Sequence, residues 1–188
     1  MTDTAAALRK GRVKLLLVGA VFLVPFLVAL ALTLAGWQPT AKGNGLPILP
    51  QRNFAQEQLS IRMADGGVWA WRDVKPRLTL IALPGPDCAS HCYAALTALA
   101  KARVMLNQNQ SRLRLLYVGA PPTGADAKGM ANFWRIGADT DGKLDAWRPS
   151  EPDSLGAVLV ESDGTALASY PAGFDPAGVL RDLRKVIR

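Results

Sequence analysis

Cys88 and Cys92 are the only cysteines in the 188-residue chain, and they stand where a predicted strand leads into a predicted helix. Residues 78–83 are a continuous apolar run, and residues 84–88, which contain glycine and proline, are predicted to form a turn. A thiol in the first turn of a helix is favoured as the thiolate by the backbone N–H groups there. Thiolates act as nucleophiles and also bind soft ions such as copper(I). The pattern therefore indicates thiol redox chemistry or soft-metal binding.

The spacing of the two cysteines leaves three interpretations open. Side chains four residues apart on a regular helix have Cβ atoms roughly 5–6 Å apart, whereas a disulfide needs about 3.5–4.5 Å. A disulfide would therefore require strain or a Cys88 displaced into the turn, while the same separation suits two thiolates that hold one copper(I) ion. Both cysteines also extend the apolar stripe of Leu96 and Leu99. Redox or copper chemistry, a passive disulfide and free core thiols are the three candidates.

His91 and Asp87 are the polar residues beside the cysteines that bear on this chemistry. His91 is the only histidine, and it lies three residues after Cys88, near the same predicted helical face. It either completes a copper site with the two sulfurs, shuttles a proton, or is an ordinary surface histidine. Asp87 is predicted as the N-cap of the helix, which would put Cys88 at the helix start. The sequence contains no glycine-rich phosphate loop and no zinc-ligand set.

Residues 15–37 contain no charged side chain and are long enough to cross roughly 30 Å of hydrocarbon. Four basic residues precede this run, and the next charge after it is Lys42. The positive-inside tendency predicts a cytoplasmic basic tail over residues 1–14, a transmembrane anchor over 15–37 and export of the remainder. A cleaved signal peptide is the alternative, but the apolar run is longer than the 7–15 residues typical of such a signal.

Residues 38–54 are rich in glycine and proline and predict a linker, and residues 55–188 predict one folded domain. The expected elements follow in chain order. They are a hairpin (58–62 and 68–72), a strand (78–83), a helix carrying Cys92, a strand (113–118), a short helix (125–134), a second hairpin (155–161 and 165–170) and a final helix capped by Asp175. The strand–helix–strand unit predicts parallel pairing. The order favours an α/β fold with a mixed central sheet and helices on both faces.

The formal net charge of +7 does not indicate nucleic-acid binding. Residues 1–14 hold four basic residues against one acidic residue, and the rest of the chain holds 18 basic residues against 14 acidic ones. The basic residues outside the N-terminal segment form no run of four or more. A phosphate-binding surface would require a clustered basic track, so we expect no nucleic-acid partner.

Residues 65–92, from the Asp-Gly-Gly turn through the Cys-x-x-x-Cys motif, resemble the membrane-anchored SCO (SCO/SenC) proteins. These proteins have a thioredoxin-like fold and assemble the copper centre of cytochrome c oxidase. The segment 157–164 resembles their late strand and Asp-Gly turn, so the similarity of layout covers roughly residues 55–188. Two positions depart from the family pattern. Tyr93 replaces a proline after the second cysteine, and Asp153 or Ser154 stands where the family has a third copper ligand, a histidine.

The resemblance implies a divergent oxidase assembly protein of the bacterial inner membrane, with a cytoplasmic N-terminus and a periplasmic domain. Cys88 would be the attacking thiol and Cys92 the resolving thiol in exchange with an oxidase subunit or another assembly factor. Copper(I) would be held by Cys88 and Cys92, with His91 in place of the absent histidine. A non-catalytic interaction protein with a passive Cys88–Cys92 disulfide is the alternative, and a thioredoxin-superfamily peroxidase is a more distant one.

Overall fold

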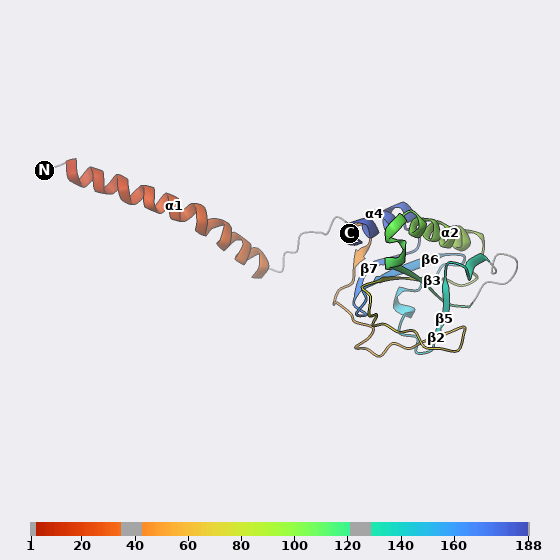
Figure 1. Ribbon diagram of the computed structural model, residues 1–188. Coiled ribbons are helices and arrows are strands. Elements are labelled where there is room, and N and C mark those ends of the chain that lie inside the picture. Colours follow the sequence, from red (N-terminus) through yellow and green to blue (C-terminus); the bar gives the residue numbers. More distant parts are fainter. Residues whose placement is uncertain (1–2, 35–42, 121–128, 188) are drawn as a thin grey trace. The chain divides into compact units, whose positions relative to one another are not determined.

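The computed structural model describes residues 3–34, 43–120 and 129–187, which fall into two units, 1–41 and 42–188. The first unit consists of helix α1 (Asp3–Leu34), drawn in red in Figure 1. Its segment Leu17–Leu34 is long and apolar enough to cross a membrane, and none of it is buried. The helix also takes in most of the predicted basic tail, while residues 35–37 of the predicted anchor lie outside the described residues.

The second unit is built on a seven-stranded mixed sheet with the order β1-β7-β6-β3-β4-β5-β2. At its centre, β3 pairs in parallel with β4 and antiparallel with β6. The strands are β1 (Leu46–Pro47), β2 (Ile61–Met63), β3 (Leu78–Pro84), β4 (Leu113–Val118), β5 (Arg135–Asp139), β6 (Leu155–Val160) and β7 (Ala166–Tyr170). All residues of β3 and β6 are buried, as their continuous apolar sequences predict for central strands. The mixed sheet is thus confirmed.

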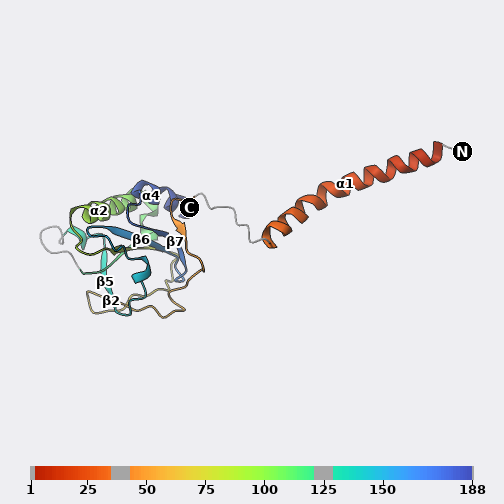
Figure 2. The ribbon, with the colours of Figure 1, turned by 180° about the vertical axis from the view of Figure 1, so that it is seen from behind.

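Helices α2 (Ser90–Val104) and α4 (Pro176–Val186) lie side by side on one face of this sheet (Figures 1 and 2). Leu96 and Leu99 of α2 and Leu183 of α4 are buried in one core cluster with β3 and β6. The prediction of helices on both faces is wrong for the described residues. The other face is covered by aromatic side chains from residues 54–71 and by the short 3-10 helix η2 (Asp145–Trp147). A second 3-10 helix, η1 (Asn107–Arg112), joins α2 to β4.

The first predicted hairpin is only partly formed. Residues 61–63 form β2, but residues 68–72 contribute a single bridge, between Val68 and Arg62, rather than a strand. The ladder partner of β2 is β5, which was not predicted. The predicted helix 125–134 falls partly outside the described residues. Gly129 and Met130 are helical, and the chain then turns towards β5.

The second hairpin and the final helix agree with the sequence. β6 and β7 pair antiparallel, and the Asp175 side chain accepts hydrogen bonds from Ala177 N and Gly178 N at the start of α4. The predicted linker 38–54 extends too far, because its residues Leu46 and Pro47 form β1 and pair with β7. Phe54, at the end of the predicted linker, is fully buried. The folded domain therefore begins before residue 46.

Candidate redox site

Cys88 and Cys92 form a disulfide with a Cα–Cα distance of 5.3 Å, beyond the C-terminal end of β3. The predicted cap of α2 is wrong. Ala89 occupies the N-cap position without a side-chain bond, and Asp87 is an exposed turn residue with φ +52°. Cys88 therefore lies in the turn before the helix. This is the displaced arrangement that allows a bridge between cysteines four residues apart.

The two sulfurs have different surroundings. Cys92 is 1% exposed and belongs to the core cluster beneath α2, whereas Cys88 is half-buried at the edge of that cluster. Cys88 also lines a cavity of about 700 Å³ between the turn 84–89 and the loop around Arg148. A reacting group can reach a disulfide only at an accessible sulfur, so the geometry favours attack at Cys88.

Asp153 accepts hydrogen bonds at the start of α2 from a loop that precedes β6. Its carboxylate binds Ala89 N at 2.7 Å, His91 N at 3.0 Å and Cys92 N at 3.0 Å. These N–H groups have no partner within the helix, because the first turn of any helix leaves its donors free. The hydrogen bonds from Cys92 N and His91 N hold the pKa of Asp153 well below its usual value. A negative charge thus occupies the helix end that would otherwise stabilise a thiolate.

His91 turns towards this carboxylate. Its Nδ1 lies 3.0 Å from Asp153 Oδ2, and its side chain is 89% exposed. The three predicted copper ligands, Cys88, Cys92 and His91, are not arranged as a metal-binding group. Within residues 3–34, 43–120 and 129–187, no three or more His, Cys, Asp or Glu side chains form such a group. His91 therefore belongs with Asp153 in this structure.

The loop carrying Asp153 is fixed against the disulfide turn by backbone contacts. Gly85 N donates to Ser154 O at 2.9 Å, and Asp153 N donates to Pro86 O at 2.9 Å. A Cβ at Gly85 would lie 2.3 Å from Glu151 O, so only glycine allows this approach. The resemblance to SCO proteins places Asp153 or Ser154 at the position of a copper-ligating histidine. It does not predict that Asp153 caps α2. The hydrogen bonds of Asp153 join residues that are 61–64 positions apart in the sequence, so no local sequence pattern could have predicted them.

Arg148 holds together the strand ends beneath the cavity. Its guanidinium donates to Pro84 O at 2.9 Å and to Val118 O at 3.3 Å, linking the ends of β3 and β4. Tyr117, which also lines the cavity, donates its hydroxyl to Ala120 O, and burial raises the pKa of Tyr117 to about 12. Arg148 therefore brings a positive charge, and Tyr117 a neutral phenol, to the cavity that Cys88 also lines.

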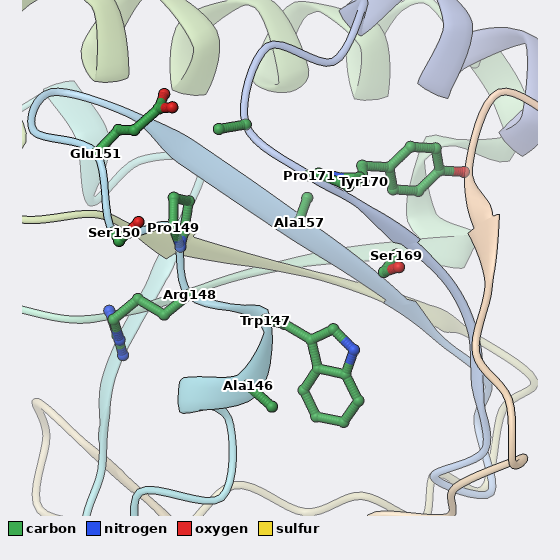
Figure 3. A pocket seen from close by; sticks show the side chains of 11 residues that line it. Ala146, Trp147, Arg148, Pro149, Ser150, Glu151, Ala157, Ser169, Tyr170 and Pro171 are labelled. Atoms are coloured by element: carbon green, nitrogen blue, oxygen red, sulfur yellow. The ribbon is translucent and has the colours of Figure 1, made fainter.

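A second cavity, of about 510 Å³, lies on the other side of the same loop. Figure 3 shows that the side chains of Arg148 and Glu151 project from this loop in different directions, while Trp147 and Tyr170 lie apart from them. The lining does not bring a nucleophile and a base together, so the disulfide cavity is the better candidate for chemistry.

The family comparison agrees with this geometry. Residues 79–188, more than half of the chain, match the family described as transmembrane-like, thioredoxin-like, C-terminal domain. The chain belongs to this family. No curated protein matches its sequence. The thioredoxin-like domain carries the disulfide at the end of β3, and the N-terminal helix supplies a candidate single membrane span.

Solved structures support the thioredoxin-like fold at low sequence identity. Apo Sco1 from Thermus thermophilus is 14% identical, with a TM-score of 0.53, over 79% of this chain and 99% of that one. The dsbF protein of MTB is 14% identical, with a TM-score of 0.50, over 70% and 97%. The bacterioferritin comigratory protein of Xanthomonas campestris is 11% identical, with a TM-score of 0.50, over 77% and 97%. At these identities the likeness shows the fold alone.

Proposed function

We propose that this protein assists the assembly of cytochrome c oxidase, acting on the copper site by thiol–disulfide exchange through Cys88 and Cys92. The observation that carries the proposal is the disulfide at the open end of β3, with Cys88 facing a cavity and Cys92 in the core. The resemblance of residues 65–92 to SCO proteins supplies the substrate class. Its partner would be an oxidase subunit or another assembly factor.

The exchange follows ordinary thiol chemistry. A thiolate of an external reductant attacks the Cys88 sulfur, the Cys88–Cys92 bond breaks, and Cys92 leaves as a thiolate that takes a proton. A second reductant thiol then attacks the mixed disulfide and releases Cys88. In the reduced protein the Cys88 thiolate attacks a disulfide of the partner, and Cys92 resolves the mixed disulfide. The two electrons thereby pass to the partner, which is left with two thiols.

Copper(I) enters this scheme as cargo. Reduction would free two soft sulfur donors with their Cα atoms 5.3 Å apart, a set suited to copper(I). Asp153 is a hard oxygen donor already bound to three N–H groups, and it is a poor replacement for a ligand histidine. We therefore favour transient transfer of copper(I) through the two cysteines, with His91 as a third ligand only after it leaves Asp153.

The same proposal includes the cellular location. The candidate span Leu17–Leu34 would anchor the chain once in the bacterial inner membrane, with the basic N-terminal segment in the cytoplasm. The thioredoxin-like domain would then lie in the periplasm, where disulfides form and persist.

A non-catalytic role is the second candidate, and one observation favours it. The Asp153 carboxylate at the start of α2 disfavours a thiolate there and so favours the oxidised bridge, as expected of a disulfide that only stabilises the turn. In that case the domain would serve as a membrane-anchored interaction protein of the oxidase or its assembly complex.

A cellular experiment separates these roles. Cys88→Ser and Cys92→Ser are each expressed at wild-type level in the native host, and cytochrome c oxidase activity and its bound copper are measured. We expect both variants to lose oxidase assembly, and the control Ser90→Ala, which alters an exposed residue at the start of α2 between the two cysteines, to retain it. Normal assembly of cytochrome c oxidase in the Cys88→Ser variant would show that the function of the protein does not require the two thiols.

A further inference from the structure

Asn44 and Gly45 form an Asn-Gly pair at the start of the folded domain. In such a pair the backbone nitrogen of the glycine can attack the side-chain Cγ of the asparagine, because no Cβ hinders the approach and the backbone reaches the required conformation easily. The N–Cγ bond forms and ammonia leaves, which gives a cyclic succinimide. Water then opens the ring to aspartate or isoaspartate. The net reaction, deamidation, consumes water and releases ammonia.

The fold requires both residues of this pair. A Cβ at Gly45 would lie 2.8 Å from the Tyr170 ring, so the chain needs a glycine beside β7. The Asn44 side chain donates to Gly178 O at 3.1 Å and to Asp182 Oδ1 at 3.0 Å, which joins the start of the domain to α4. The chain therefore carries a reactive sequence at a place where neither residue can be exchanged without losing these contacts.

The folded domain restrains both reacting groups. Gly45 N donates to Asp182 Oδ2 at 3.1 Å, and Asn44 N donates to the same oxygen at 2.6 Å. The attacking nitrogen must lose its proton, and a carboxylate at this N–H disfavours that loss because two negative charges would then face each other. The hydrogen bonds of the Asn44 amide to Gly178 and Asp182, together with one from Arg181 to Asn44 Oδ1 at 3.2 Å, hold the amide on α4. Its Cγ is therefore not free to turn towards Gly45 N.

We infer that Asn44 is a deamidation site that Asp182 and Gly178 keep unreactive in the folded domain. Reaction then requires a local opening that releases residues 44–45 from α4, so its rate is the rate in the unfolded chain multiplied by the open fraction. An aspartate at position 44 lacks the two donors of the amide and places a second carboxylate beside Asp182, so the opened segment cannot close again in the same way. Deamidation would thus detach the start of the domain permanently. The inference is independent of the disulfide chemistry.

The experiment follows deamidation of the full chain in detergent micelles by peptide mass spectrometry, at mildly alkaline pH. The folded wild type is compared with the same chain unfolded in guanidinium, which requires no variant. Gly178→Ala then tests the contact itself, because its Cβ would lie 2.9 Å from the Asn44 side chain and displace it, while alanine favours the helix. Gly129→Ala is the matched control, since a Cβ there meets none of the described residues beyond its chain neighbours within 4 Å. Hydrogen exchange in β3 and β6 reports whether each variant is folded.

We expect Asn44 to deamidate at least about tenfold more slowly in the folded wild type than in the unfolded chain, because the open fraction of a folded segment is small. Gly178→Ala should react at least about threefold faster than the folded wild type, with β3 and β6 still protected, and Gly129→Ala at the wild-type rate. Asn107 and Asn109, each followed by glutamine, should react slowly in every sample. Equal rates at Asn44 in the folded and unfolded wild type would overturn the inference, and so would an unchanged rate in Gly178→Ala.

The variant Asn44→Asp tests the consequence, because it has the sequence of the aspartate product. We expect backbone hydrogen exchange of residues 44–48 to become faster, while β3 and β6 exchange as in the wild type. Unchanged exchange of residues 44–48 would contradict the detachment of the domain start.

Discussion

Asp153 and Asp182 are two carboxylates that bind backbone N–H groups far away in the sequence, at different parts of the domain. Asp153 binds the start of α2 across 61–64 residues, and Asp182 binds the start of the domain across 137–138 residues. The Asp182 side chain is 11% exposed and the Asp153 side chain 23% exposed. Asp182 therefore joins structural elements in the interior, whereas Asp153 places a charge at the accessible site of the disulfide.

The comparison shows that a carboxylate bound to backbone N–H groups can serve either the stability of the domain or the chemistry of the disulfide. Burial alone would raise the pKa of Asp182, but the hydrogen bonds from Asn44 and Gly45 outweigh it and the pKa is lowered. The hydrogen bonds from Cys92 N and His91 N lower the pKa of Asp153. Both groups stay ionised in the folded domain. We expect Asp182 to govern global stability and Asp153 to govern the disulfide.

Asp182→Ala tests the structural half of this comparison and has the largest expected effect. It leaves the Asn44 and Gly45 N–H groups without their acceptor, so we expect a loss of about 3 kcal/mol in the free energy of unfolding. Guanidinium unfolding of the full chain in detergent micelles, followed by tryptophan fluorescence, measures it. The control Asp145→Ala changes a side chain that is 67% exposed and should cost less than about 0.5 kcal/mol. An equal loss of unfolding free energy in the two variants would contradict the structural role assigned to Asp182.

Acid pH should weaken both contacts together. A carboxylate whose pKa is lowered by folding contributes its full stability above its unfolded pKa, about 3.9, and loses it as the pH falls through the folded value. We expect the stability of the wild type to fall below about pH 4, and that of the double variant Asp153→Asn, Asp182→Asn to fall less steeply. The midpoint of guanidinium unfolding between pH 2 and pH 7 measures this slope. Parallel curves for the two proteins would contradict the lowered pKa values.

Asp153→Asn tests the site half and has the smallest expected effect on stability. Removing the negative charge leaves the positive end of the α2 dipole uncompensated, which favours a thiolate there, so the reduction potential should rise by about 10–40 mV. Equilibration with glutathione buffers, followed by alkylation and mass measurement, gives the potential. Asp145→Asn removes a carboxylate that lines the same cavity but pairs with Arg148, and it should leave the potential nearly unchanged. A potential that falls in Asp153→Asn would reverse the assigned role.

Local sequence patterns predicted the elements whose signals are local. The continuous apolar runs located β3, β4 and β6, and Asp175 followed by Pro176 located the start of α4. The pattern did not locate β5, in which the only buried residue is a glycine, Gly137, and which pairs with the short edge strand β2. A sheet edge of this kind leaves little periodicity to detect.

The site was predictable in its chemistry and not in its geometry. The spacing of Cys88 and Cys92 indicated a thiol pair, but the position of Cys88 before the helix depends on the positive φ of Asp87, an uncommon conformation outside glycine. The capping of α2 by Asp153 arises from tertiary packing of the loop before β6 on the disulfide turn. Neither feature is encoded in a local repeat or spacing.

The reduction potential of the Cys88–Cys92 disulfide tests the central claim most directly. It is measured on the full chain in detergent micelles, with glutathione and dithiothreitol buffers that cover the full range. A working exchange pair is expected to lie between about −270 and −120 mV, the range of thioredoxin-like oxidoreductases. A potential below about −300 mV, typical of structural disulfides, would contradict the proposed exchange and favour the passive bridge.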